Sequence, residues 1–392
     1  MAQSDRWLLP DGVEELLPEE ATVVEQLRRQ VLDLFASHGF GLVMPPLVEF
    51  TDSLLLGLGH DMDVDSFKVV DETSGRLMAV RPDFTPQVAR IDAHSLAPEG
   101  ISRLCYAGSV LHTRPRNLHA TRSPIQLGAE LYGDNSVEAD IEIIRLMLAM
   151  FDKLGIQNLT LDLGNIGIFE AMAEQAGLLG QAHDDVFAAV QRKAQADIET
   201  AAASAGLGDV WQRRFVALAQ SYGDIEVMQH IDGLFDDVPV VVTQAIEELG
   251  KVVAAIEASH PTVNCFVDLA ELRGYHYHTG LVFAVYAQGY GQALANGGRY
   301  NDIGEVFGRS RAATGFSSEL KILSRLSTCT TNTLECVFST YSDDADVAHA
   351  VAQFRKQGVV VISGLPGESV PGNATHELKN IEGRWQPVAL QH

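Results

Sequence analysis

Four separated segments of this 392-residue chain combine charged, amide and aromatic side chains that could recognise a small zwitterion. They are residues 80–85 (VRPDFT), 126–133 (QLGAELYG), 273–280 (RGYHYHTG) and 295–300 (ANGGRY). Side chains two apart on a strand face the same way, so Gln126 and Glu130 should share one face, and Arg273 and Tyr277 another. Carboxylates pair with an ammonium group, and an arginine binds a carboxylate. These residue types therefore predict a site for a ligand that carries both charges.

The segments must be positioned by a sheet and by the helices that cover it. Apolar residues recur at helical spacing over residues 19–38, between a proline and a glycine, which predicts a helix. A proline-interrupted strand follows at 40–48, then a hairpin with strands at 66–71 and 76–81, and a helix from 85 to about 94. Further elements are predicted as strands over 102–132, a helix at 137–154, and strands at 262–269 and 275–286.

Residues 166–260 differ in character, because they are rich in alanine and glutamine and are helical in pattern throughout. We interpret them as a helical insertion within one domain formed by residues 1–165 and 261–328. The remaining residues, 329–392, are expected to form a small α/β segment with short strands at 334–340 and 359–362 around a helix at 346–357. Since the strands are not spaced as βαβ units, the predicted fold class is α+β with a mixed, mainly antiparallel sheet.

The bulk composition argues against several classes of function. The chain has 52 acidic and 28 basic residues, a formal charge of −24, which disfavours binding to nucleic acid. No apolar run reaches the roughly 18 residues of a membrane span, and the N-terminus has no signal pattern. The four cysteines form no CxxC pair, which is typical of reduced thiols in a cytoplasmic protein.

Two smaller patterns in the sequence involve histidines and arginines. His276 and His278 form an alternating pair that could border a metal site, but no third ligand stands at suitable spacing, so we expect no metal and no other cofactor. The densest basic stretch contains Arg114, Arg116 and Arg122, and the sequence leaves open whether these bind an anionic ligand or are simply solvated.

Taken in order, the four segments resemble class II aminoacyl-tRNA synthetases, specifically the histidyl enzyme, over about residues 1–325. RPDFT at 81–85 resembles the family's Arg-Pro-Glu-Gly-Thr, and Gln126 and Glu130 match its Gln-x-x-x-Glu. RGYHYHTG is similar to its Arg-Gly-Leu-Asp-Tyr-Tyr-Thr-Gly, and the GGRY at 297–300 is identical to its own. The resemblance implies a histidine site in which Asp83, Thr85 and Gln126 hold the amino end. It further implies that Glu130 and His278 read the imidazole, and that Arg273 and Tyr277 complete the pocket with the arginine near the carboxylate.

The chain departs from the synthetase pattern where ATP would be activated. The family's motif 2 arginine and glutamate, which grip the α-phosphate and adenine, correspond to His112 and Arg114. The motif 3 arginine that binds the γ-phosphate corresponds to Ile322, and Lys321 is about 100° away on a helix. Adenylation needs fixed positive charge aimed at the phosphates of ATP. We therefore expect that this chain does not catalyse adenylation.

Further departures affect the rest of the chain. His278 replaces a tyrosine and His276 an aspartate, so the imidazole contacts cannot be copied from the synthetase. Only about 60 residues follow the catalytic-type domain, where the synthetase has an anticodon-binding domain of about 90, within the usual range for a small domain. Residues 330–392 carry seven acidic and four basic side chains, a net charge of −3 that suits an anticodon stem poorly.

A paralogous family with these properties is that of the regulatory subunits of short-form ATP phosphoribosyltransferase. This resemblance implies a non-catalytic chain that activates a catalytic subunit and binds L-histidine for feedback inhibition at the first step of histidine biosynthesis. It implies a homodimer, built on the segment 40–48, within a hetero-oligomer, and neither tRNA nor membrane as a partner. The alternatives are an active histidyl-tRNA synthetase or a related ATP-dependent ligase.

Overall fold

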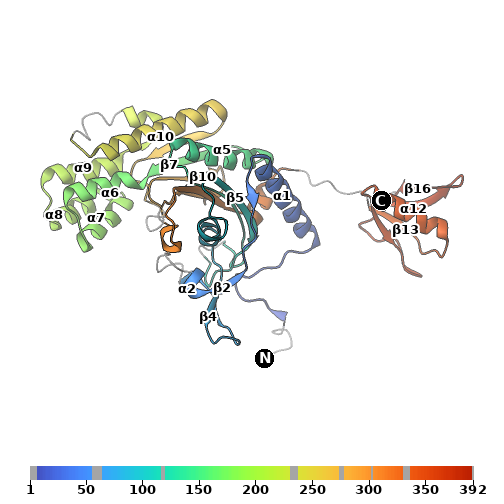
Figure 1. Cartoon of the computed structure of the whole chain (residues 1–392). Coiled ribbons are helices and arrows are strands. Elements are labelled where there is room, and N and C mark those ends of the chain that lie inside the picture. Colours follow the sequence, from blue (N-terminus) through green and yellow to red (C-terminus); the bar gives the residue numbers. More distant parts are fainter. Residues whose placement is uncertain are drawn as a thin grey trace. The chain divides into compact units, whose positions relative to one another are not determined.

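A computed structural model describes residues 7–54, 64–115, 120–229, 237–272, 278–301, 303–329 and 336–390. The chain divides into two compact units, residues 1–329 and 330–392. The first unit is built on a nine-stranded sheet in the order β1-β5-β6-β12-β11-β10-β7-β9-β8 (Figure 1). Its strands are β1 (Gly41–Leu42), β5 (Ser102–Ser109), β6 (Ile125–Tyr132), β12 (Ala313–Glu319), β11 (Ala295–Arg299), β10 (Leu281–Ala287), β7 (Leu159–Asn165), β9 (Asn264–Asp268) and β8 (Tyr222–Gly223).

Among these strands only the pairs β1–β5 and β7–β9 are parallel, so the sheet is mixed and mainly antiparallel, as the sequence predicts. Helices cover one of its faces and bury an extensive apolar core. They are α1 (Pro18–Ser37), α5 (Val137–Lys153), α10 (Val240–Ser259) and α11 (Leu320–Leu326). The predicted helix at 19–38 is thus confirmed within one residue at each end.

Alternation along β6 explains how the other face becomes available for a site. Leu127, Ala129 and Leu131 join the core under the helices. Gln126 and Glu130 therefore point to the opposite face, because successive side chains of a strand alternate. On that face lies a second, smaller apolar cluster, which includes Phe84, Tyr106 and Tyr300.

The predicted strand at 40–48 is shorter than expected. It is limited to β1 and to β2 (Val48–Phe50), which are separated by Pro45 and Pro46. Prolines cannot donate a ladder hydrogen bond, so the chain leaves the large sheet there and enters a small one. That sheet has the order β2-β4-β3, with β3 at Lys68–Val70 and β4 at Leu77–Val80, beside the short helix α2 (Thr51–Leu54).

The helix that follows β4 changes its type part way along. It runs as α4 (Thr85–Arg90) and continues as the π-helix η2 (Ile91–Leu96). It ends at Ala97, which has a positive φ of 42°. A short turn of 3-10 helix, η4 (Glu305–Phe307), lies between β11 and β12 in the chain.

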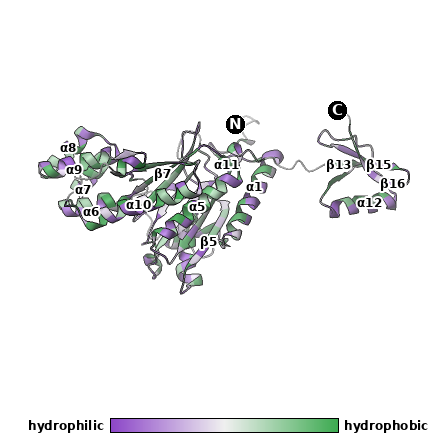
Figure 2. Ribbon diagram, turned by 90° about the horizontal axis from the view of Figure 1, so that it is seen from above, coloured by the Kyte–Doolittle hydropathy of each residue, from purple (hydrophilic) through white to green (hydrophobic). Residues whose placement is uncertain are grey.

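The described residues between 166 and 260 (166–229 and 237–260) are mostly helical and include one short strand, β8. The helices of this segment are α6 (Ile166–Ala176), α7 (Gln181–Gln191), α8 (Gln195–Ser204), α9 (Asp209–Gln220), η3 (Ile225–Gln229) and α10. Figure 2 shows hydrophobic and hydrophilic residues alternating along these helices, as expected where only one face of a helix is packed.

The second unit is a four-stranded sheet in the order β14-β13-β15-β16 with one helix, α12 (Ala345–Lys356). Its strands are β13 (Cys336–Ser339), β14 (Val360–Ser363), β15 (His376–Ile381) and β16 (Arg384–Ala389). The sequence predicted only the first two strands and missed the β15–β16 hairpin, which is rich in polar residues. Within the described parts of the chain, no helix has the length and apolar character needed to cross a membrane.

Candidate functional site

The start of α4 is joined to strand β6 by a network around Asp83. Gln126 Nε2 donates to Asp83 Oδ2 at 3.0 Å, and Gln126 Oε1 accepts from the Phe84 backbone N–H at 3.0 Å. The other carboxylate oxygen, Asp83 Oδ1, accepts from the Thr85 N–H at 2.7 Å. An acceptor-rich carboxylate is thus held in a fixed orientation, as recognition of an ammonium group requires.

Glu130 is almost completely buried, with 1% of its surface exposed, and three hydroxyl groups donate to its carboxylate. Tyr106 Oη lies 3.0 Å from Oε1 and Thr85 Oγ1 lies 3.2 Å from it, while Tyr300 Oη donates to Oε2. Burial raises the pKa of Glu130 to about 8, against the lowering effect of these hydroxyls. A carboxyl group that titrates near neutral pH can bind an imidazole and exchange a proton with it.

The space beside Glu130 is kept by a glycine. A Cβ atom at Gly315, on the adjacent strand β12, would overlap Glu130 Oε2. Any side chain at this position would therefore displace the carboxylate from its three hydroxyl donors.

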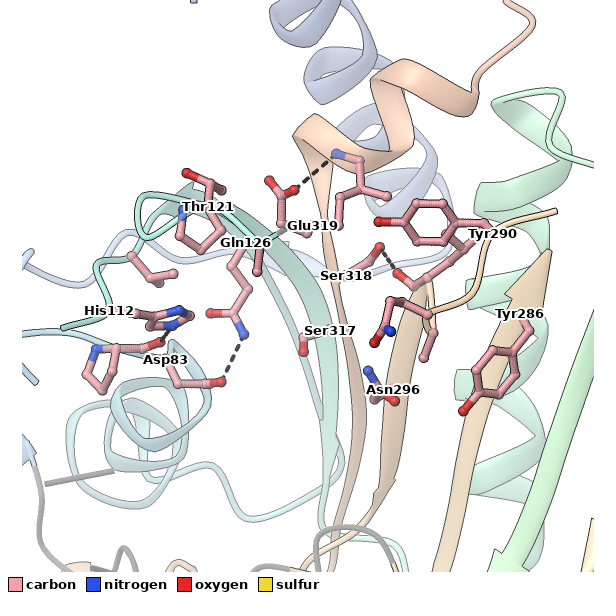
Figure 3. Close-up of a pocket in the computed structure, with 18 of the residues that line it drawn as sticks. Asp83, His112, Thr121, Gln126, Tyr286, Tyr290, Asn296, Ser317, Ser318 and Glu319 are labelled. Atoms are coloured by element: carbon pink, nitrogen blue, oxygen red, sulfur yellow. Dashed lines mark hydrogen bonds between the residues drawn. The ribbon is translucent and has the colours of Figure 1, made fainter. Parts of the chain in front are cut away.

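A cavity of about 450 Å³ opens on the face of the sheet to which Gln126 and Glu130 point (Figure 3). Figure 3 shows Asp83 and Gln126 on one side of it, Ser317 and Asn296 on the strands at its base, and Tyr286 opposite. Its lining consists of Pro82, Asp83, Val110, His112, Ala120, Thr121, Pro124, Gln126, Tyr286, Tyr290, Gly291, Gln292, Ala293, Leu294, Asn296, Ser317, Ser318, Glu319 and Ile322. Among these described residues there are two carboxylates and neither a lysine nor an arginine.

Two of the positions at which the sequence departs from the synthetase motifs, His112 and Ile322, line this cavity. His112 is buried, and its Nε2 lies 2.9 Å from the Pro82 carbonyl oxygen. Ile322 lines the wall, near the start of α11, where Glu319 caps the backbone N–H groups of Lys321 and Ile322. The cavity therefore presents an imidazole and an alkyl group where the family has arginines.

Lys321 does not replace the missing charge. Its Nζ donates to the Ser123 carbonyl at 2.7 Å and lies 3.3 Å from Glu14 Oε1. The ammonium group is used to hold α11 against the N-terminal segment, and Lys321 is absent from the cavity lining.

The basic stretch whose role the sequence left open is partly structural. Arg122 Nε donates to the His112 carbonyl at 3.1 Å, and its NH1 donates to the Asp11 carbonyl at 2.9 Å. Its guanidinium also lies 5.2 Å from the centre of the Phe67 ring. Arg114 is exposed, and Arg116 lies outside the described residues.

The remaining sequence-predicted site residues are only partly placed. Arg273, Tyr277 and His276 lie outside the described residues. His278 is half-buried, and its ring lies over Gly298, where an added Cβ would approach its Cδ2 to 2.7 Å. Thr85, Glu130 and His278 do not line the 450 Å³ cavity, whereas Asp83 and Gln126 do. No cluster of three potential metal ligands occurs within the part of the chain that is described.

Several residues of the site were missed by the sequence analysis. Tyr106 and Tyr300 hold Glu130, and Asn296, Ser317 and Tyr286 contribute polar groups to the cavity. Tyr300 and Asn296 belong to the segment ANGGRY, whose residue types mark it in the sequence but do not identify its contacts. Tyr106 gave no signal, since a buried tyrosine in an apolar strand is usually a core residue.

The chain is similar to two known protein families over separate ranges. Residues 12–323 match the family described as histidyl-tRNA synthetase, and residues 335–388 match the ATP phosphoribosyltransferase subunit HisZ C-terminal domain. An ATP phosphoribosyltransferase regulatory subunit from Methylococcus capsulatus is 46% identical over 97% of this chain and 95% of its own. The regulatory subunit from Stutzerimonas stutzeri is 48% identical over 96% and 95%, and that from Pseudomonas entomophila is 47% identical over the whole of both chains.

Solved structures show the same fold. A chain described as an ATP phosphoribosyltransferase regulatory subunit/histidyl-tRNA synthetase from Bacillus halodurans superposes with a TM-score of 0.82 at 23% identity, covering 94% of this chain and 96% of the other. A histidyl-tRNA synthetase from Nostoc gives 0.77 at 16%, with 98% and 97% covered. A chain from the Thermotoga maritima ATP phosphoribosyl transferase (HisG:HisZ) complex gives 0.59 at 19%, with 76% and 97% covered. A class II synthetase-like fold is therefore confirmed.

Proposed function

Since the chain belongs to the family of ATP phosphoribosyltransferase regulatory subunits, we propose that it binds L-histidine and reports this binding to a short-form catalytic subunit. In this proposal the chain activates the catalytic subunit, and bound histidine reverses the activation as feedback inhibition at the first step of histidine biosynthesis. The effect of histidine on the partner requires a coupling free energy between the histidine site and the intersubunit contact.

The observation that carries the proposal is the charge of the cavity. Asp83 and Gln126 offer acceptors for an ammonium group, yet none of the described lining residues offers a cation for a phosphate. A triphosphate beside the carboxylates of Asp83 and Glu319 would be repelled, because a desolvated anion needs a fixed positive partner. The site therefore favours an amino acid and disfavours its activation by ATP.

Each predicted site residue has a role in this proposal. Asp83, Thr85 and Gln126 bind the amino group of histidine, and the Thr85 backbone N–H orients the Asp83 carboxylate. Glu130 and His278 bind the imidazole, while Arg273 and Tyr277 complete the pocket with the arginine on the carboxylate. When Glu130 is ionised, the three hydroxyl groups leave one of its about four acceptor positions for an N–H group of the ligand.

We further propose that the chain works as a homodimer within a hetero-oligomer in the cytoplasm, with no tRNA or membrane partner. Support comes from β1, the edge strand of the large sheet, and from the side chains of Leu42, Met44 and Leu47, which are exposed in it and just after it. An exposed apolar edge of a sheet is prone to pair with another chain. The four cysteines are free thiols, as expected in a reducing compartment.

Calorimetry and an exchange assay on the isolated chain test the proposed site. L-Histidine should bind, and histidine-dependent exchange of pyrophosphate into ATP should stay at the level of an enzyme-free control. The reason is that His112 and Ile322 supply no charge for the developing phosphate. Exchange above that background would instead identify an active synthetase, and a chain that does not bind histidine would exclude the proposed site.

A further inference from the structure

Residues 81–90 contact two different parts of the molecule. On one side, Asp83, Phe84 and Thr85 make the hydrogen bonds to Gln126 and Glu130 that form the proposed histidine site. On the other side, three residues of the same segment bind the chain at 45–49, which leads from the exposed edge strand β1 into β2. Arg81 lies two positions before Asp83, and Gln87 lies two positions after Thr85, so contacts of the two sets alternate closely along the chain.

Arg81 makes the first group of contacts to 45–49. Its NH1 donates to the Pro45 carbonyl at 2.9 Å and its Nε donates to the Ser109 carbonyl at 2.9 Å. Its backbone N–H donates to the Leu47 carbonyl at 3.0 Å. The guanidinium also lies 3.7 Å from the centre of the Phe84 ring, so it is fixed between the site segment and the 45–47 backbone.

The environment of Arg81 is unusual for a charged residue. Only 7% of its surface is exposed, and burial lowers the pKa of its guanidinium to about 10. The planar fork binds two carbonyl groups at once, which a lysine ammonium on a flexible chain cannot do with the same geometry. A buried cation in such contacts moves only together with the groups it binds.

Gln87 makes the second group of contacts. It is 1% exposed, and its Nε2 donates to the Pro46 carbonyl at 2.8 Å and to Glu49 Oε1 at 2.8 Å. Glu49 is held in turn by Arg90 NH2 at 2.6 Å. Because Pro45 and Pro46 have no N–H group, their carbonyl oxygens are the only backbone groups through which they can be held.

We propose that Arg81 and Gln87 are positioning residues that transmit occupancy of the histidine site to the surface segment 42–49. A ligand bound at Asp83 and Thr85 restrains the start of α4, and the contacts of Arg81 and Gln87 pass that restraint to Pro45, Pro46 and Leu47. The inference rests on the proposed function, because it needs histidine at the site. It adds the path by which that site reaches the exposed edge of the sheet.

Hydrogen exchange measured by mass spectrometry tests this path in the full chain. In the wild type, saturating L-histidine should slow exchange in two peptides, one covering β6 and one covering 43–49. We expect about fivefold slowing in the second, at the lower end of ordinary coupling. In Gln87→Ala and in Arg81→Lys, the β6 peptide should still respond, while the response of the 43–49 peptide should fall by about threefold or more.

Arg76→Ala is the matched control. Arg76 is an exposed arginine on the neighbouring hairpin, 3.7 Å from the centre of the Phe50 ring and 3.3 Å from Asp52, and it does not contact the site segment. This variant should keep both responses. A merely structural role for Arg81 and Gln87 would reduce both peptides' responses together.

The outcomes separate the two proposals. A wild-type chain that binds histidine without any response at 43–49 overturns this inference and leaves the proposed function intact. The inference is also overturned, with the proposed function left intact, if histidine still slows exchange at 43–49 in both the Gln87→Ala and the Arg81→Lys variants. A chain that shows no histidine binding by calorimetry overturns both.

Discussion

Replacing Glu130 with leucine is expected to weaken histidine binding by about 100-fold or more. Truncating one partner of a buried, hydrogen-bonded polar pair typically costs 2–5 kcal/mol or more, since the other partner is left unpaired. The substitution also removes the acceptor that the hydroxyl groups of Tyr106, Thr85 and Tyr300 share. Calorimetric titration of L-histidine into wild type and variant measures the change.

A matched variant keeps the prediction testable if the leucine variant folds poorly. Glu130→Gln preserves the shape and an acceptor for the hydroxyls, and should still weaken histidine binding, by about tenfold. Retention of wild-type histidine affinity in the glutamine variant would show that the carboxyl group of Glu130 does not contact the ligand.

The glutamine variant also removes a titration that the structure predicts. The pKa of Glu130 is raised from 4.5 to about 8 by burial, so the folded chain holds a proton that the unfolded chain has lost. The contribution of Glu130 to stability is therefore complete below about pH 4.5 and is lost as the pH rises to about 8. Between pH 5 and 8.5, the wild type should lose stability relative to Glu130→Gln, as measured by urea unfolding at each pH. A constant difference would contradict the raised pKa.

The second large effect is expected from Arg299→Met, which should destabilise the first unit by about 3–5 kcal/mol. Arg299 belongs to the motif GGRY, but its side chain stabilises the fold by binding Asp140 and the segment 134–136. Its Nε and NH2 bind Asp140 Oδ2 at 3.1 and 2.8 Å, and both residues are buried. Its other hydrogen bonds go to the Asp134 and Ser136 carbonyls and to Asn135 Oδ1.

Removal of Arg299 would leave the Asp140 carboxyl group buried without its cation. Burial raises the pKa of Asp140 even beside Arg299, so this position disfavours an isolated negative charge. Urea unfolding of Arg299→Met measures the loss, and Arg76→Ala, which breaks an exposed pair with Asp52, should cost at most about 1 kcal/mol. Equal and small losses in the two variants would refute a structural role for Arg299.

The sequence could predict those features that depend on local pattern. The helix α1 follows from apolar residues at helical spacing between Pro18 and Gly39. The shared face of Gln126 and Glu130 follows from the alternation of a strand, and in the structure both hydrogen-bond to residues at the start of α4. The departures at His112 and Ile322 were also visible in the sequence, although only the structure shows that both line one cavity.

What the sequence could not predict depends on contacts between distant residues. Asp140 and Arg299 are separated by 159 positions, and neither has a local feature that identifies the other as its partner. The same holds for Tyr300 on Glu130, 170 positions away. The hairpin β15–β16 was missed for another reason, since polar side chains in its strands weaken the alternation that marks a strand.

The central claim is that occupancy of this site regulates a partner, and one measurement tests it most directly. The rate at which a short-form ATP phosphoribosyltransferase catalytic subunit forms its product is followed alone, with this chain, and with this chain and L-histidine. We predict that the chain raises the rate and that histidine lowers it again, whereas Glu130→Leu raises the rate but makes it insensitive to the same histidine concentration. A rate that is unchanged by the wild-type chain, or a histidine effect that persists in Glu130→Leu, would contradict the account.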